Sequence, residues 1–175
     1  KVHTTSQNGQ VADQSKWLWL GTKPFQAPDV LKEIRPHLRK RPLVLSMMAG
    51  ISTGLIRGLL GGKARVVRFL LNTHAFLGEG MTGVYFSPGI SAREKKQVLE
   101  VLKATGETAV FAKESALDAV TGLSGSGPAF VFYCLAAMEQ GGRRAGLKIT
   151  LARRLALQTL KGAAMLLVHT GKDPA

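Results

Sequence analysis

The pattern of apolar residues changes once along the chain, near residue 114. Before this point, short apolar runs typical of buried strands alternate with segments of helical periodicity, whereas only helical patterns follow it. Apolar strands separated by helices favour a mostly parallel sheet that is covered on both faces. The sequence therefore predicts an α/β part over residues 1–114 and an all-α part over residues 115–175.

The expected elements follow from the apolar runs and from helix-start signals. Strands are expected at residues 17–20, 43–48, 64–71, 81–86 and 108–111. Helices are expected at residues 28–38 and 52–60, from Ser91 to Gly106, and at residues 115–140 and 150–169. Asp29 is the expected N-cap of the first helix, and Ser91 and Glu94 have the spacing of a capping box.

Cysteine and histidine are too sparse for a disulfide framework or a metal site. Cys134 is the single cysteine, and the four histidines lack the spacing of metal ligands. A chain without disulfides fits a reducing compartment, so we expect it to be cytoplasmic. The apolar stretches look too short to cross a bilayer, and we expect no membrane partner.

The net charge of +13 raises the question of a nucleic-acid or phosphate partner. The densest basic clusters, Arg39-Lys40-Arg41 and Arg143-Arg144, are short and have no aromatic stacking pattern beside them. Scattered lysines and arginines that solvate the surface explain the composition equally well. We therefore expect no specific nucleic-acid partner.

The segment Asp118–Ala129, DAVTGLSGSGPA, concentrates small side chains. Small residues allow a helix to pass close to another backbone or to a ligand, and the Gly-Ser-Gly core could hold an anion through its N–H groups. The segment is not a Walker motif, because no Gly-Lys-Ser/Thr follows it, and it departs from a nucleophile elbow. From the residues alone, close helix packing and ligand binding both remain open.

This small-residue segment resembles the start of the helical domain of pyrroline-5-carboxylate reductases. The resemblance continues downstream with Gly141-Gly142, Gly146-Leu147, Gln158-Thr-Leu and Gly162-Ala-Ala-Met-Leu166. Upstream, the residues that fall in the family's order and spacing are Asn8, Lys23-Pro24, Ser46, Ala49-Gly50, Asn72-Thr73 and Gly78-Glu79-Gly80. The similarity thus covers nearly the whole chain.

The resemblance implies an α/β fold, with an incomplete Rossmann-type parallel sheet followed by an all-α dimerisation domain. It implies hydride transfer from NADP(H) or NAD(H) to the imine of 1-pyrroline-5-carboxylate, which gives L-proline, and a homo-oligomer that is at least a dimer. No residue is singled out as catalytic, because the reaction needs mainly positioning and charge balance.

The family's roles carry over to the residues that match. Those expected to line the cofactor are Asn8, Lys23, Pro24, Ala49, Gly50, Asn72 and Thr73. Those expected near the substrate are Ser124, Gly125, Ser126 and Gly127. The Lys23-Pro24 turn would follow a strand, and ligands bind at the carboxyl ends of strands in open α/β sheets.

The sequence also departs from the family. Its Gly-x-Gly-x-x-Gly/Ala turn and its Ser-Pro-Gly-Gly-x-Thr loop have no counterpart among these 175 residues. We therefore expect this polypeptide alone to bind cofactor weakly, to be inactive, and to expose a sheet edge. It would be a fragment, a truncated reading frame or a degenerate member of the family. Among smaller departures, His74 replaces a proline after Asn-Thr, and Met47-Met48 replace smaller residues that would face the nicotinamide.

Two rival hypotheses remain. A hydroxy-acid dehydrogenase of similar fold would need a catalytic lysine on the helical part, and the surroundings of the one mid-helix candidate, Lys161, do not match. A non-enzymatic basic protein derived from a reductase would bind phosphate or nucleic acid with a steep salt dependence.

Overall fold

The computed structural model describes residues 2–62 and 64–174. The chain forms two compact units, Lys1–Ser126 and Gly127–Ala175. This division lies twelve residues beyond the boundary expected at residue 114, because the first turns of the long helical segment pack on the sheet. The assignment of residues 1–114 and 115–175 to cofactor and dimerisation roles stays a prediction.

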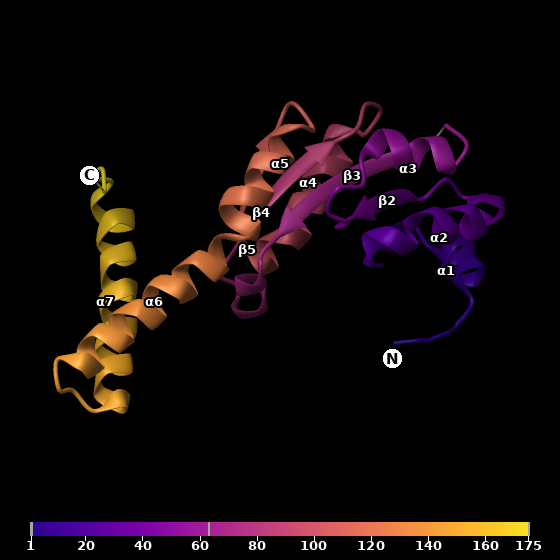
Figure 1. Cartoon of the computed structure of the whole chain (residues 1–175). Helices are drawn as coiled ribbons and strands as arrows, with labels where there is room; N and C mark the ends of the chain where they lie inside the picture. The colour runs from indigo at the N-terminus through magenta and orange to yellow at the C-terminus, as the bar shows by residue number, and fades with distance from the viewer. Residues whose placement is uncertain (1, 63, 175) are drawn as a thin grey trace. The chain divides into compact units, whose positions relative to one another are not determined.

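The first unit is built on a sheet that, in the described residues, has five strands in chain order (Figure 1). They are β1 (Trp17–Leu20), β2 (Leu43–Ser46), β3 (Arg65–Leu71), β4 (Gly80–Phe86) and β5 (Gly106–Phe111). The expected α/β class and all five expected strands are confirmed. β1, β2 and β3 are parallel, as are β4 and β5, whereas β3 and β4 pair antiparallel. The eight-residue connection between β3 and β4 explains this reversal, because a parallel pair needs a longer crossover.

The helices of the first unit connect the strands and cover both faces of the sheet. They are α1 (Asn8–Gln14), η1 (Pro24–Gln26), α2 (Ala27–Ile34), η2 (Arg35–His37), α3 (Thr53–Leu59), η3 (Thr73–Leu77), α4 (Ala92–Leu102), η4 (Lys103–Thr105), α5 (Ala116–Val120) and the π-helical turn η5 (Thr121–Gly125). The expected N-cap at Asp29 is wrong: the N-cap is Gln26, three residues earlier, and Asp29 lies in the first turn. Pro28 near the helix start explains the shift, since proline suits the first helical positions.

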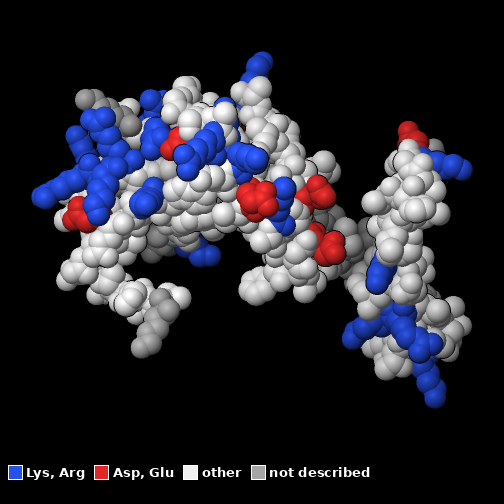
Figure 2. Space-filling model, turned by 180° about the vertical axis from the view of Figure 1, so that it is seen from behind, with Lys and Arg blue, Asp and Glu red and all other residues white. Residues whose placement is uncertain are grey.

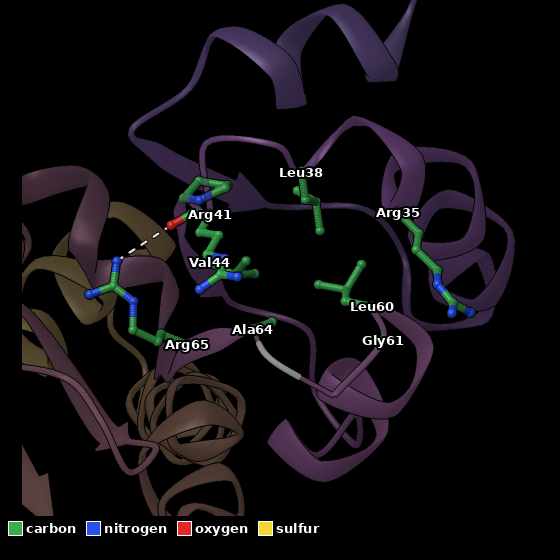
Figure 3. Close-up of a pocket in the computed structure, with 9 residues that line it drawn as sticks. Arg35, Leu38, Arg41, Val44, Leu60, Gly61, Ala64 and Arg65 are labelled. Atoms are coloured by element: carbon green, nitrogen blue, oxygen red, sulfur yellow. Dashed lines mark hydrogen bonds between the residues drawn. The ribbon is translucent and has the colours of Figure 1, made fainter.

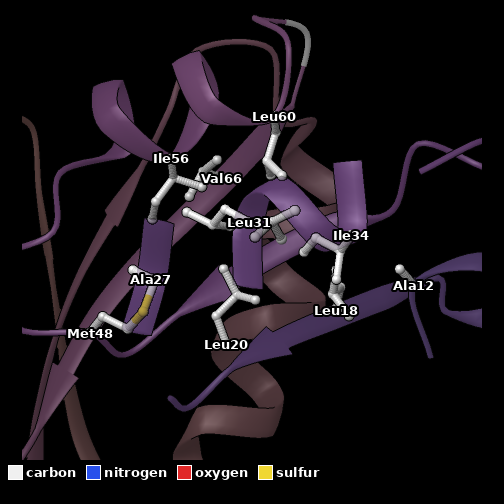
Figure 4. Close-up of a cluster of buried hydrophobic side chains, with 11 residues drawn as sticks. Ala12, Leu18, Leu20, Ala27, Leu31, Ile34, Met48, Ile56, Leu60 and Val66 are labelled. Carbon is white, nitrogen blue, oxygen red and sulfur yellow. The ribbon is translucent and has the colours of Figure 1, made fainter. Parts of the chain in front are cut away.

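Two apolar clusters hold the sheet between its helices. On one face, Leu31 and Ile34 of α2 and Ile56 of α3 pack on Leu20 and Val66 (Figure 4). On the other face, Leu43, Leu45, Val67 and Phe69 pack against Val98 of α4. Because successive side chains of a strand point to opposite faces, β2 and β3 contribute to both clusters. β1 forms one edge of the sheet, where Trp19 is 40% exposed.

The capping box at the start of α4 is confirmed. Ser91 Oγ accepts a hydrogen bond from Glu94 N at 3.3 Å, and Ser91 N donates to Glu94 Oε2 at 3.0 Å. The hydrogen bonds from Ser91, with a smaller contribution from Arg65, lower the pKa of Glu94 below its ordinary value.

Ser91→Ala is expected to destabilise the protein by about 1 kcal/mol, since it leaves a backbone donor of the first helical turn without its partner. Urea unfolding measures this change. The exposed Ser6, which caps no helix, provides the matched control as Ser6→Ala. Equal unfolding midpoints for the two variants would show that the box contributes nothing.

The second unit is a pair of packed helices, α6 (Gly127–Arg144) and α7 (Ile149–Thr170). They approach closely where a Cβ on Gly142 would lie 3.1 Å from Ala152 Cβ. Large apolar side chains remain exposed along both helices, among them Phe130, Tyr133, Met165, Leu166 and Val168. By length and composition alone, the helical segment Ala116–Arg144 could also cross a membrane, which the sequence analysis did not anticipate.

Candidate active site

The carboxyl ends of the three parallel strands β1, β2 and β3 meet at one edge of the sheet. The segments that follow β1 and β2 touch there, because Met47 N donates to Leu20 O at 3.2 Å and Thr22 Oγ1 lies 3.5 Å from Met48 Sδ. The structure therefore brings the segment containing Lys23 and Pro24 next to the one that leads into Ala49 and Gly50. This edge is where ligands bind in open α/β sheets.

The turn after β1 has a fixed backbone and an exposed side chain. Lys23 N donates to Gln26 Oε1 at 3.1 Å, and Gln26 N donates back to Lys23 O at 2.9 Å. Pro24 begins η1, so its ring further restricts the turn. The Lys23 side chain is left exposed at the edge, where its ammonium group can reach an anionic ligand.

The segment after β2 is also fixed close to the end of its strand. Met48 N donates to Ser46 Oγ at 3.3 Å, and Ala49 and Gly50 lie exposed beyond it. In the described part of the chain, no atom lies within 4 Å of the position a Gly50 Cβ would take, so a ligand could approach this backbone closely. Of the two methionines expected to face the nicotinamide, Met48 is instead buried in the core, and only Met47 is partly exposed.

Asn72, directly after β3, joins the strand ends to the small-residue segment. Its side chain is buried, and Nδ2 lies 3.3 Å from both the carbonyl oxygen and the Oγ of Ser124. Its Oδ1 accepts from Met81 N at 3.4 Å. Both ends of the amide are thus used, and residues 52 positions apart in the sequence are held together.

Ser124 lies in the π-helical turn, not in a loop. Ser126 N donates to Thr121 O at 2.8 Å across five residues, and Thr121 Oγ1 donates to Leu117 O at 2.8 Å. Single π turns inside helices are frequent at functional sites. Among the described residues nothing lies within 4 Å of a Cβ placed on Gly122, so packing within the chain does not require a small residue there.

Three of the expected site residues have other surroundings. Asn8 begins α1, where its Nδ2 donates to Glu33 Oε2 of α2 at 2.9 Å. Thr73 is the exposed first residue of η3, and Gly127 is the first residue of α6. The structure therefore groups Lys23, Pro24, Ala49, Gly50, Asn72 and Ser124, with Gly125 and Ser126 following Ser124 along the chain.

A buried ion pair that the sequence analysis missed supports this arrangement. Arg68 Nη1 donates to Glu114 Oε1 at 3.0 Å, and the side chains of Arg68 and Glu114 are 5% and 21% exposed. The other hydrogen bonds to Glu114 come from Thr53 N at 2.7 Å and Thr53 Oγ1 at 2.6 Å, at the start of α3. Because Asn72 continues the extended backbone four residues after Arg68, both side chains face the same way, and β3 with the residue after it holds the segment 114–124 at two points. An arginine inside an otherwise apolar run was the sequence signal for this pair.

Opposing influences act on the Glu114 carboxylate. Burial is the largest and would raise its pKa, but the hydrogen bonds from Thr53 and the charge and hydrogen bond of Arg68 together outweigh it. The pKa of Glu114 therefore lies below its ordinary value of 4.5, and the group is ionised at neutral pH.

A mainly parallel α/β sheet whose polar residues gather at the strand carboxyl ends, followed by a helical unit, defines a Rossmann-type fold. Residues 114–175 match the family model described as pyrroline-5-carboxylate reductase dimerisation. Over its helical segment the chain therefore matches the pyrroline-5-carboxylate reductase family. This match favours the reductase hypothesis over the hydroxy-acid dehydrogenase hypothesis.

Similar proteins support this assignment over almost the full chain. Pyrroline-5-carboxylate reductase 3 of Danio rerio is 38% identical over 175 residues, which are 99% of this chain and 60% of that protein. The solved reductase of Coxiella burnetii is 31% identical, with a TM-score of 0.90 over 98% of this chain and 64% of the other. The Plasmodium falciparum reductase, solved with NADP bound, is 27% identical, with a TM-score of 0.89 over 98% of this chain and 66% of the other. The chain thus spans about 60–66% of the length of these relatives.

Proposed function

We propose that the whole protein is an NAD(P)H-dependent pyrroline-5-carboxylate reductase, and that this chain contributes the edge at which cofactor and substrate meet. The observation that carries the proposal is the contact between Asn72 and Ser124, which joins the strand-end edge to the π-helical turn. The bound NADP of the Plasmodium falciparum relative supports a nicotinamide cofactor. The expected residues fit such a cofactor, because Lys23 offers an exposed cation and Gly50 an open backbone.

The roles of the residues follow from their chemistry. The cofactor would supply the hydride for the imine carbon. Lys23 would balance the negative charge of its phosphates, while Pro24, Ala49, Gly50 and Thr73 would give its rings a close backbone surface. Asn72 would hold the strand ends, where the cofactor binds, in a fixed position relative to Ser124, Gly125, Ser126 and Gly127. These four residues would lie beside the substrate. Such positioning of two reactants is worth several orders of magnitude in rate.

Asn8 is the least supported of these assignments. Its amide already donates to Glu33, so a role at the cofactor would require that contact to be shared or exchanged.

A second copy of the chain is the proposed partner of the helical unit. The exposed apolar side chains of α6 and α7 support this, because an apolar surface of this kind needs another surface to cover it. The match to a dimerisation family model over residues 114–175 supports the same partner in preference to a membrane, for which one apolar helix is weak evidence. We propose that the enzyme acts in the cytoplasm, which is consistent with the single, exposed Cys134.

A chimera tests this function. The 175 residues replace the aligned region of the Coxiella burnetii reductase, and oxidation of NADPH is followed with 1-pyrroline-5-carboxylate present. The chimera is expected to turn over, whereas the 175-residue polypeptide alone is expected not to. A folded, oligomeric chimera without turnover would argue against the proposal.

Within the chimera, Asn72→Ala is expected to lower kcat/KM about a hundredfold, because a misplaced π turn no longer holds the substrate against the cofactor. Asn8→Ala is the comparison, since it removes the same kind of side chain from a contact with α2. A kcat/KM unchanged by Asn72→Ala would rule out the positioning role, and a raised KM for NADPH in Asn8→Ala would support a cofactor role for Asn8.

A further inference from the structure

A hollow of about 300 Å³ opens at the amino ends of β2 and β3 (Figure 3). Val44 and Arg65 line it from these strand starts, and Leu60 and Gly61 from the end of α3. Because β2 and β3 are parallel, their amino ends lie at the edge of the sheet opposite the candidate active site. The pocket is therefore separate from the residues proposed to bind cofactor and substrate.

The pocket combines an apolar floor with a basic rim. Leu38 and Leu60 lie in its middle, Arg41, Arg65 and Val44 lie on one side and Arg35 on the other (Figure 3). Its remaining lining residues are Pro42, Gly61 and Ala64. Among the described residues, no acidic side chain lines it.

The charge of this rim is only partly balanced. Arg65 pairs with Glu94, whereas no carboxylate in the parts of the chain that the structure describes forms an ion pair with Arg35 or Arg41. Arg39 and Lys40 adjoin the pocket in sequence, and Lys and Arg side chains gather over the end of the first unit that α2 and α3 form (Figure 2). An anion that enters the hollow therefore meets uncompensated positive charge.

The backbone at Arg41, a residue of the rim, is strained. Its φ is 49°, in the left-handed region that glycine and asparagine occupy more easily. The turn is held by Arg41 N, which donates to Leu38 O at 3.1 Å, and by Arg65 Nη2, which donates to Arg41 O at 3.4 Å. Strained residues of this kind concentrate where the side chain has a function.

We propose that this pocket binds a small phosphate monoester, with its phosphate between the arginine side chains and its carbon body on the apolar floor. Guanidinium groups match phosphate oxygens through paired, charge-assisted hydrogen bonds. The volume is at the lower end of the range for small-molecule sites, which suits a compact ligand. A nucleic-acid strand fits less well, because among the described residues no aromatic side chain lines the pocket for base stacking.

Phenyl phosphate, inorganic phosphate and phenol are the probes, titrated into the ¹⁵N-labelled 175-residue chain and followed by NMR. Phenyl phosphate is expected to bind more tightly than either of the others, because only it uses both the rim and the floor. The amide signals expected to shift are those of Val44, Leu60 and Gly61. Shifts confined to Lys23 and Gly50 would overturn the proposal, since they would locate the phosphate at the candidate active site.

Two variants separate binding from folding. Arg41→Gly is expected to weaken phenyl phosphate binding at least tenfold while Tm stays equal or rises, because glycine relieves the strain at this position. Arg35→Gln is expected to weaken binding to a similar extent. Arg154→Gln, an equal charge change at an exposed site on α7, is the control and should bind as the parent does. Unchanged affinity in both rim variants would overturn the proposal, as would tighter binding of a single-stranded RNA that the same variants abolish.

Discussion

Glu114→Gln is expected to destabilise the first unit by about 3 kcal/mol at neutral pH, because it leaves the buried Arg68 guanidinium without its counter-charge. The glutamine keeps the shape of the side chain and can still accept a hydrogen bond from Thr53, so the loss reports mainly on the charge. Urea unfolding at pH 7 measures it. Asp118→Asn is the matched control, because Asp118 is 76% exposed and lies 3.9 Å from Arg68 Nη2.

A double variant distinguishes the loss of the pair from a general loss of packing. Arg68→Met with Glu114→Gln removes the uncompensated charge, so it is expected to be more stable than Glu114→Gln alone. The electrostatic explanation fails if the double variant has a lower free energy of unfolding than Glu114→Gln alone. Such a result would mean that packing of the Arg68 side chain matters more than its charge.

The same pair predicts a pH dependence with a definite sign. The folded-state pKa of Glu114 lies below its ordinary value of 4.5, so the carboxylate stabilises the fold above that value. This contribution is lost as the pH falls below 4.5 and through the folded-state pKa. The stability difference between the parent and Glu114→Gln should therefore shrink in acid, and a difference that grows in acid would contradict this sign.

The fold was largely predictable because its strands are short, apolar and separated by helix signals. The runs at residues 17–20 and 43–46 each supply side chains to both faces, which is the pattern of strands covered on two sides. α1 was missed because its sequence, NGQVADQ, is mostly polar and it depends on contacts with α2 and His37. The antiparallel direction of β4 depends on the short connection through η3. The sequences of β3 and β4 themselves give little indication of this direction.

The candidate site was predictable where it follows strand ends and unpredictable where it depends on distant contacts. Lys23, Ala49 and Asn72 each lie within three residues of a strand end, and parallel strands bring such positions to one edge. The hydrogen bond from Asn72 to Ser124 and the ion pair from Arg68 to Glu114 join residues 52 and 46 positions apart. Local sequence patterns do not specify such pairs, nor the extra residue that turns a helical segment into a π turn.

The start of β5 should tolerate no side chain at all. Gly106 is paired with Gly80, and a Cβ added to Gly106 would lie 2.2 Å from Gly80 O and 2.5 Å from Gly80 N. Both obstacles are backbone atoms of a neighbouring strand, so no flexible side chain can move aside. In addition, Gly106 has a φ of 120°, which L residues rarely adopt.

Gly106→Ala is therefore expected to destabilise the protein by about 2–6 kcal/mol, as the sum of backbone strain and steric overlap. A loss of this size is a large fraction of the stability of a typical domain, so the variant should unfold at much lower urea concentration or fail to fold. β5 ends three residues before Glu114. Loosening the pairing of Gly106 with Gly80 therefore also weakens the attachment of the segment that carries Ser124.

Gly89→Ala separates the two causes. Gly89 has a φ of 87°, but in the described residues no atom lies within 4 Å of the position its Cβ would take. Gly89→Ala should therefore introduce backbone strain without steric overlap, and should lower the free energy of unfolding by about 1–2 kcal/mol. If the two variants unfold at the same urea concentration, the close approach of Gly106 to Gly80 is not what requires glycine at the start of β5, and the pairing of β4 with β5 is looser than the structure has it.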